Sequence, residues 1–463
     1  MKLKYIKYFM LVAWFTFLVL ASFEEIACAQ NALKDRLTGV INSDSLSKTA
    51  VVAVSVRDAS TGTLIFSRQG QYFLHTASTL KALTMPVVLQ TLGKSYNVET
   101  TLLKTPEDKY FLKLSGDPLL KTDDLIKLFK EAKSRGVLTI NGELIIDDSA
   151  IDEIPWGVGW MWDDENNPLM PKYSVYNLDY NVITVKVSPG RLNQPPVITV
   201  VPDYGIRIVN LAKTGNQNDF SIERRPWLDP EAIYIEGIFN TAVSKKIPVG
   251  IPKNYFISRL KYAIKIAGIE FSEGIKHGSV SQQATTIAKV SRKILDEIGF
   301  VNQKSNNTGA ETLFKLAGGR YSKLEGSTKN GLKAMKNFYK TIGADCSSQE
   351  IVDASGASHN NLIQPDWMTL ALSKLYQWPL FSEYKKTLAQ PGQEGTLKYR
   401  HQDLSGRLYA KTGTLAGISG FTGYLKANSG KTYAFSILIQ NYKGSSLPAK
   451  NLESKIINTI RHY

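Results

Sequence analysis

The sequence predicts an α+β fold in which one antiparallel sheet is built from both ends of the chain, with a β-rich insertion between them. Three observations lead to this prediction. Strand patterns at Val51–Arg57 and Leu64–Arg68 precede a helix near the N-terminus. Three further strand patterns and a helix close the chain. The long stretch between these parts carries short β patterns separated by turn residues.

The N-terminal part begins with an amphipathic helix pattern at Asn31–Asn42. The two strand patterns that follow are joined by a turn at Ala59–Gly62 and form a hairpin. A second, apolar helix begins near Ser78 and ends at Gly93, a residue suited to the position after a helix. Pro86 lies within it and removes one backbone hydrogen bond.

The middle of the chain contains a helix pattern at Thr122–Gly136, another at Pro252–Ile269, and several β patterns between and before them. The β patterns are rich in Val and Ile and are bounded by turn residues. They lie at Leu144–Ile146, Val182–Val187, Val197–Val201, Ile206–Leu211 and Ile233–Ile238.

The last third alternates between helix and strand patterns. We expect helices at Thr285–Ile298, Glu311–Ala317, Leu332–Ile342 and Ala449–Ile460. We expect antiparallel strands at Leu408–Lys411, Gly420–Lys426 and Thr432–Gln440. The expected organisation is a domain formed by residues 30–95 and 280–463, with residues 96–279 inserted as two subdomains.

The N-terminus predicts export. Three lysines precede an apolar run at Phe9–Phe23, and Ala27-Cys28-Ala29 provides a small-x-small cleavage pattern. We therefore expect residues 1–29 to be a signal peptide, with secretion across the inner membrane to the periplasm or cell envelope. A membrane anchor is disfavoured because the run is shorter than a membrane span needs. Lipidation of Cys28 is disfavoured because Glu25 stands where an aliphatic residue is required.

Composition limits the partners. The formal net charge is +15, which attracts polyanions. The lysines are scattered and no nucleic-acid motif is present, so an anionic cell-wall polymer or membrane lipid headgroups fit an exported protein better than nucleic acid does. Oligomeric state cannot be read from the sequence. After processing, Cys346 stands alone and forms no internal disulfide.

The reactive residues point to a Ser-Lys pair. The five histidines show no metal-ligand spacing, no G-x-S-x-G elbow is present, and we expect neither metal nor cofactor. Ser78 and Lys81 are three residues apart, which brings both onto one face of a helix. A buried lysine beside a serine can lose its proton and act as a base. The S-x-x-K pattern alone is weak, because it recurs at Ser45/Lys48, Ser258/Lys261 and Ser382/Lys385.

Two companion motifs support the choice of Ser78 as the nucleophile. Ser305 and Asn307 form an S-x-N turn that can present a hydroxyl and an amide to a cleft. Lys411, Thr412, Gly413 and Thr414 lie on a strand pattern, where the lysine and hydroxyls suit a substrate carboxylate and the glycine allows close approach. Further S-x-N copies at Ser95/Asn97 and Ser358/Asn360, and a K-T-G copy at Lys213–Gly215, lack this context or order.

The three motifs in this order are similar to those of penicillin-binding proteins and class A β-lactamases. The match extends to Tyr110–Pro118, Gly142–Asp148, Trp160–Asp164, Asn177–Asn181, Asp353–Gly356, Gly395–Leu397 and Lys411–Leu415. On these residues the chain resembles the low-molecular-mass class C penicillin-binding proteins, the D-alanyl-D-alanine carboxypeptidase/endopeptidases of serine peptidase family S13. The resemblance implies a penicillin-recognising, β-lactamase-like fold that acts on peptidoglycan stem peptides and is inhibited covalently by β-lactams.

The resemblance also implies the role of each residue. Ser78 is acylated, and Lys81 is its general base. Ser305 and Asn307 relay protons and bind the substrate amide, while Lys411 supports the charge network. Thr412 and Thr414 bind the terminal carboxylate beside Gly413, the backbone N–H groups of Ser78 and Thr414 form an oxyanion hole, and Asp147 contacts the distal stem peptide.

This sequence departs from the family at Asn306, where aspartate is usual, and at Thr76, where proline is common. Ala354, Ala357 and His359 replace the usual Gly, Leu and Arg, which affects the expected substrate preference more than catalysis. No E-x-x-L-N segment follows Ser305, so the resemblance implies slow release of penicillin. The alternatives are an esterase or β-lactamase, or a non-catalytic wall-binding protein, on the same fold.

Overall fold

The computed structural model describes residues 31–271 and 274–463, and the expected signal peptide, residues 1–29, lies outside them. The central sheet has five strands in the order β16-β17-β18-β1-β2, all antiparallel. Its strands are β1 (Val51–Asp58), β2 (Leu64–Arg68), β16 (Leu408–Leu415), β17 (Ile418–Lys426) and β18 (Thr432–Gln440). The prediction that both chain ends build one sheet is confirmed, because β1 pairs with β18 from Val51 opposite Gln440 onward.

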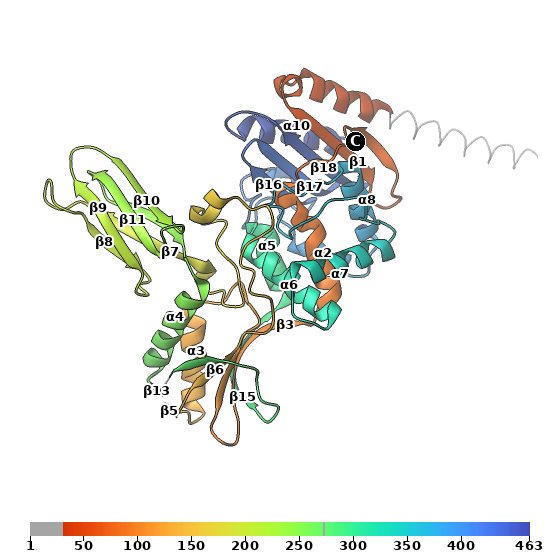
Figure 1. Ribbon diagram of the computed structural model, residues 1–463. Helices are drawn as coiled ribbons and strands as arrows, with labels where there is room; N and C mark the ends of the chain where they lie inside the picture. Colours follow the sequence, from red (N-terminus) through yellow and green to blue (C-terminus); the bar gives the residue numbers. More distant parts are fainter. Residues whose placement is uncertain (1–30, 272–273) are drawn as a thin grey trace, which may run out of the picture.

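Helices cover both faces of this sheet (Figure 1). The helix at residues 31–43 and α10 (Leu447–Arg461) share one apolar core with Val52, Val54 and Val56 of β1. The alternate residues of β1 point to the opposite face, where Ser55 hydrogen-bonds to Thr369 of α8 (Pro365–Tyr376) at 2.8 Å. Within the described residues, no helix is long and apolar enough to cross a membrane.

The helix after Ser78, α2 (Lys81–Leu92), is buried from its first residue through Leu89. Pro86 cannot donate to the carbonyl oxygen of Ala82, the residue four positions earlier. The structure gives that oxygen another donor, because the Tyr384 hydroxyl lies 2.7 Å from it. A proline in the middle of this helix is therefore accommodated by a buried tyrosine. Around α2 pack α5 (Ile294–Lys304), α6 (Asn307–Ser322), α7 (Thr328–Thr341) and α9 (Phe381–Thr387).

The insertion begins with a mixed five-stranded sheet in the order β14-β6-β4-β3-β15. Its strands are β3 (Asn97–Lys104), β4 (Tyr110–Lys113), β6 (Leu144–Asp147), β14 (Ile275–His277) and β15 (Thr285–Lys293). The helices α3 (Thr122–Ser134) and α4 (Pro252–Ala267) and the short pair β5 (Thr139–Ile140) and β13 (Glu270–Phe271) complete this body, drawn at the bottom of Figure 1.

One predicted helix is wrong. Residues 285–293, expected to be helical, form β15, and only the residues from Ile294 onward are helical. The segment T-T-I-A-K-V-S-R-K is rich in β-branched residues and pairs along its length with β3, so strand pairing outweighs its ambiguous periodicity. The sheet of the insertion thus reaches past residue 280, where the catalytic domain was expected to resume.

The rest of the insertion contains two three-stranded sheets, ordered β12-β7-β8 and β10-β11-β9, at the left of Figure 1. The strands are β7 (Val182–Ser188), β8 (Val197–Val201), β9 (Arg207–Thr214), β10 (Asp219–Arg225), β11 (Asp229–Phe239) and β12 (Val243–Pro248). Short 3-10 turns connect the bodies and fill loops: η1 (Ser45–Lys48), η2 (Ala77–Leu80), η3 (Trp162–Asn166), η4 (Asp179–Asn181) and η5 (Gln402–Leu404).

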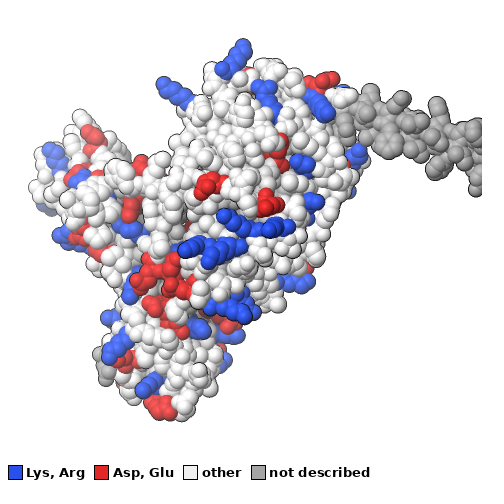
Figure 2. Space-filling view, turned by 45° about the vertical axis from the view of Figure 1, so that its right-hand side comes forward, with Lys and Arg blue, Asp and Glu red and all other residues white. Residues whose placement is uncertain are grey.

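The positive charge is unevenly spread. On the face in Figure 2, basic side chains form a band across the middle, and acidic side chains gather below and to the left of it. The large uncharged areas above and below the band separate the remaining lysines and arginines. This face therefore offers a local basic strip rather than a continuous basic surface of the kind that follows a nucleic-acid backbone.

Candidate active site

Ser78, the predicted nucleophile, lies where three parts of the chain meet. Ser78 is in η2, directly before α2, and is partly exposed. Two glycines let neighbouring backbone approach it closely. A Cβ on Gly356 would lie 1.9 Å from the carbonyl oxygen of Ala77, and a Cβ on Gly413 would lie 3.0 Å from the backbone nitrogen of Ser78. The position of Ser78 is thus fixed between the loop at Gly356 and the edge strand β16.

Lys81 lies below Ser78 and is completely buried. Its Nζ atom donates to Ser78 Oγ at 2.9 Å, to Asn307 Oδ1 at 2.6 Å and to the carbonyl oxygen of Ser355 at 2.7 Å. These three acceptors use all three donor positions of an ammonium group. In the neutral amine, one hydrogen is absent and the lone pair can face Ser78, which is the arrangement a general base requires.

Burial determines the protonation of Lys81. Loss of hydration lowers its pKa from 10.5 to about 7, because the charged form is the one that burial disfavours. The negative charges of Asp353 and Glu311 act in the opposite direction and limit the decrease. Lys81 therefore has a pKa near neutrality and lies beside the Ser78 hydroxyl, as its predicted role of general base requires.

The S-x-N motif forms the turn between α5 and α6. Ser305 caps α5 in a left-handed conformation, with φ of 59°. Asn306 is the N-cap of α6, and its side-chain oxygen accepts from the Gly309 backbone N–H at 2.6 Å. Asparagine and aspartate are equally good N-caps, which explains in physical terms why the departure at this position is tolerated. Asn307, the first residue of α6, directs its amide oxygen to Lys81.

Lys411 is the second buried lysine of the site. It comes from β16, and its Nζ donates to Ser305 Oγ at 2.8 Å and to the carbonyl oxygen of Thr412 at 2.7 Å. Burial lowers its pKa well below the ordinary lysine value, and the nearby positive charge of Lys81 lowers it further. The three motifs thus form two hydrogen-bonded pairs, Ser78 with Lys81 and Ser305 with Lys411.

These residues line one cleft of about 570 Å³. Ser78, Ser305, Asn307, Thr412 and Thr414 contribute to its wall, and the two lysines lie beneath it. The insertion closes the opposite side with a loop that carries Met161, Asp163, Asp164, Asn167, Leu169 and Met170. The Asn307 amide nitrogen joins the two sides, because it donates to the carbonyl oxygen of Leu169 at 2.9 Å.

Asp147 lies apart from this group. It is buried at the end of β6, where its carboxylate accepts from the Ser149 hydroxyl at 2.7 Å and from the Val280 backbone N–H at 3.3 Å. The acidic side chains that do line the cleft are Asp163 and Asp164. The sequence stretch that contains them was part of the resemblance, but no local pattern linked it to the cleft.

The sequence also did not indicate two buried carboxylates, Glu311 and Asp353, as part of the site. Glu311 lies one turn after Asn307 on α6 and accepts backbone N–H groups of Ala354 and Ser355, the latter at 2.8 Å. Asp353 accepts from the backbone N–H groups of two residues in the same loop and from Trp160 Nε1 at 3.0 Å. The two carboxylates hold the loop whose Ser355 carbonyl oxygen accepts from Lys81.

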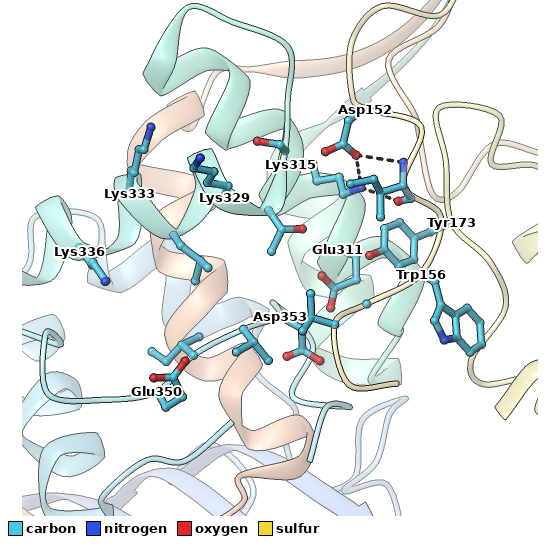
Figure 3. Close-up of a pocket in the computed structure, with 18 residues that line it drawn as sticks. Asp152, Trp156, Tyr173, Glu311, Lys315, Lys329, Lys333, Lys336, Glu350 and Asp353 are labelled. Carbon is cyan, nitrogen blue, oxygen red and sulfur yellow. Dashed lines mark hydrogen bonds and ion pairs between the residues drawn. The ribbon is translucent and has the colours of Figure 1, made fainter. Parts of the chain in front are cut away.

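Glu311 and Asp353 also line a second cavity, of about 550 Å³. Figure 3 shows their carboxylates at its centre and the Lys315–Asp152 ion pair on its upper wall. Burial and the negative charge of Asp353 raise the pKa of Glu311. The charges that act on Lys81 therefore lie between the catalytic cleft and this second cavity.

Comparisons with known proteins agree with this geometry. The family model described as D-Ala-D-Ala carboxypeptidase 3 (S13) matches residues 33–462. The chain is 24% identical to the D-alanyl-D-alanine carboxypeptidase DacB of Haemophilus influenzae, over 86% of this chain and 87% of that protein. It is 26% identical to a D-alanyl-D-alanine carboxypeptidase of Actinomadura sp. strain R39, over 89% and 81%.

Solved structures show the same fold. The crystal structure of penicillin-binding protein 4 (dacB) from Haemophilus influenzae superimposes with a TM-score of 0.81 at 22% identity, covering 92% of this chain and 99% of that one. A second structure of that protein, complexed with a β-lactam, has a TM-score of 0.76 at 21% identity and the same coverage. The predicted α+β, penicillin-recognising fold is confirmed.

Proposed function

The chain belongs to the D-Ala-D-Ala carboxypeptidase 3 (S13) family, and we propose that it is a serine DD-peptidase that cleaves peptidoglycan stem peptides through an acyl-Ser78 intermediate. One observation carries this proposal: Ser78 Oγ lies 2.9 Å from Nζ of a fully buried lysine whose pKa is lowered to about 7. A serine attacks a carbonyl group only when a base takes its proton, and Lys81 is placed and tuned for that task.

The acylation step follows from the contacts. Ser78 Oγ attacks the carbonyl carbon of the penultimate D-Ala, and its proton passes to the lone pair of neutral Lys81. The carbonyl oxygen becomes an oxyanion, which the backbone N–H groups of Ser78 and Thr414 stabilise. Collapse of this intermediate breaks the peptide bond. The leaving nitrogen takes a proton from the Ser305 hydroxyl, which Lys411 holds in place through their 2.8 Å hydrogen bond. The proton that Lys81 took from Ser78 replaces it, so Lys81 is neutral again before water enters.

Water completes the cycle. It attacks the acyl-Ser78 ester, gives its proton to Lys81 and releases the shortened peptide, and Ser78 recovers its proton. The substrate's terminal carboxylate binds at Thr412 and Thr414, next to the Lys411 amine, and Gly413 lets the peptide lie against β16. Carboxypeptidase and endopeptidase reactions use the same steps and differ only in the leaving amine.

The partners follow from the same chemistry. A cationic group on the stem peptide would meet Asp163 and Asp164 in the cleft, and they are better placed for it than Asp147. β-Lactams mimic the acylating peptide bond and form a covalent adduct with Ser78. Export to the periplasm or cell envelope places the enzyme beside its substrate, and the excess of lysine and arginine over acidic residues favours contact with anionic wall polymers or membrane lipids.

Labelling with a fluorescent penicillin tests the proposal. The mature protein and its Ser78→Ala variant are incubated with the probe and digested, and the labelled peptide is identified by mass spectrometry. We expect one stable adduct on the peptide that contains Ser78, absent from the variant. An adduct on another serine would refute the assignment of the nucleophile, and absence of any adduct would favour a non-catalytic wall-binding protein.

Two further assays separate the reaction types. Release of D-Ala from a pentapeptide measures carboxypeptidase activity, and conversion of a cross-linked muropeptide dimer to monomers measures endopeptidase activity. Steady-state hydrolysis of benzylpenicillin tests the β-lactamase alternative. We expect slow penicillin turnover, and rapid turnover would contradict a DD-peptidase that penicillin inhibits.

A further inference from the structure

Two tryptophans form an exposed aromatic surface beside the cleft. Trp162 begins η3 and is 72% exposed, and Trp227 lies in the turn between β10 and β11 and is 60% exposed. Their rings meet edge to face, with centroids 5.5 Å apart. Leu228 and Leu169 extend the apolar surface at 62% and 73% exposure. Exposing a cluster of large apolar side chains to water costs free energy, so such a cluster indicates a binding surface for a ligand or partner.

The structure holds this surface rigidly. Asn166 of η3 and Arg224 of β10 exchange two hydrogen bonds, from Asn166 Nδ2 to the Arg224 carbonyl oxygen at 3.0 Å and from the Arg224 backbone N–H to Asn166 Oδ1 at 2.6 Å. The guanidinium of Arg224 is buried and forms an ion pair with Glu165 at 3.2 Å. Figure 1 shows η3, in yellow, beside the β10–β11 sheet. The two indoles are therefore held together before any ligand arrives, which reduces the entropy lost on binding.

The surface continues from the catalytic cleft. Met161 and Asp163, the residues on either side of Trp162, both line that cleft, and so does Leu169. A substrate whose peptide lies in the cleft would thus have its next chemical group over the indoles. This position limits the occupant to something joined to the stem peptide or bound alongside it.

We propose that Trp162 and Trp227 form a saccharide-binding platform for the sugar that carries the stem peptide. This inference rests on the proposed function. A sugar ring presents C–H groups on one face, which complement the electron-rich face of an indole, while its hydroxyls remain in water. An open pair of aromatic rings suits such a ligand, whereas an acyl chain or an apolar helix would require an enclosed groove.

Binding is tested with the Ser78→Ala protein, so that no reaction takes place. The probe is a β-1,4-linked tetrasaccharide of N-acetylglucosamine, titrated by calorimetry. We expect saturable binding that the double substitution Trp162→Ala/Trp227→Ala weakens by about tenfold or more. The matched control is Leu324→Ala, which removes another exposed apolar side chain, 70% exposed, outside this surface and should leave binding unchanged. Equal binding by the double variant would overturn the proposal.

Kinetics provide the second readout in the active enzyme. A peptide ending in D-Ala-D-Ala is compared with the same peptide attached to its disaccharide. We expect the double variant to raise KM for the disaccharide-linked peptide about tenfold and to leave the free peptide unaffected. Equal loss for both substrates would show a structural effect and refute the platform. If the double variant sedimented more slowly than the wild-type protein and bound the sugar equally well, the platform would be refuted and this surface would instead be an interface between two copies of the chain.

Failure of the proposed function would look different. In that case the wild-type enzyme would cleave neither substrate and would not react with penicillin, whatever the tetrasaccharide does. Failure of the platform alone would leave cleavage and labelling intact, with no preference for the disaccharide-linked peptide.

Discussion

Acylation of Ser78 should depend on pH through the protonation of Lys81. Only the neutral amine can accept the serine proton, so the acylation rate follows the fraction of Lys81 that is unprotonated. Because burial lowers the pKa of Lys81 to about 7, that fraction is about one half at pH 7. The rate should therefore rise with pH below 7 and level off above it.

The size of the effect follows from the same pKa. At pH 5, two pH units below it, about 1% of Lys81 is neutral, so acylation should be about 100-fold slower than at pH 9. An exposed lysine with a pKa of 10.5 would be neutral in only about 3 molecules in 10,000 at pH 7. The difference between these two pKa values corresponds to about 5 kcal/mol, and burial of the side chain supplies it.

The assay is the second-order rate of labelling by a fluorescent penicillin between pH 5 and 9, at constant ionic strength. Circular dichroism at each pH verifies that the protein remains folded. The Lys81→Met variant keeps the length of the side chain without a base, and its labelling should be slower by about 10²- to 10⁴-fold and independent of pH. A flat wild-type rate across this range would refute the assignment of Lys81 as the base.

Three other substitutions have defined outcomes. Ser305→Ala removes the side-chain acceptor of the second buried lysine, and acylation measured by penicillin labelling should fall by about 10²-fold. Gly356→Ala would place a Cβ 1.9 Å from the carbonyl oxygen before the nucleophile and should abolish labelling, whereas Gly392→Ala, at nearly the same φ but with no atom within 4 Å, should retain it. Arg292→Ala leaves the buried carboxylate of Asp117 without its ion pair, and urea unfolding should show a loss of about 3–5 kcal/mol; unchanged stability would contradict that role.

The sequence predicted the parts of the site that depend on local geometry. Ser78 and Lys81 are three residues apart on a helical turn, so their contact follows from helix geometry alone. The strand predicted at Leu408–Lys411 is confirmed as the first half of β16. Order along the chain then separated these motifs from their decoys, for example the Lys213 copy, which the structure places on β9 in the insertion.

Contacts between distant residues could not be predicted in this way. Glu311 was recognised only as the start of a helix, and its role depends on backbone N–H groups more than 40 positions later. Residues 285–293 carried both strand and helix periodicity, and only pairing with β3 decides between them. The role of Asp147 came from the resemblance and stays a prediction, and the hydrogen bond that its carboxylate accepts from Val280 could not be predicted from its own segment. In each of these cases the deciding contact is made with a residue far away in the sequence, so the local sequence does not reveal it.

The site gains its chemistry from an arrangement that is unfavourable for stability. Burial lowers the pKa of both Lys81 and Lys411, and the positive charge of Lys81 lowers the pKa of Lys411 further. The buried carboxylates of Asp353 and Glu311 offset part of this cost for Lys81, because their negative charges raise its pKa. A protein that only bound peptidoglycan would gain stability by replacing the lysines with apolar residues of similar size. Both lysines, with hydroxyl groups within 3 Å of each, are therefore best explained by catalysis.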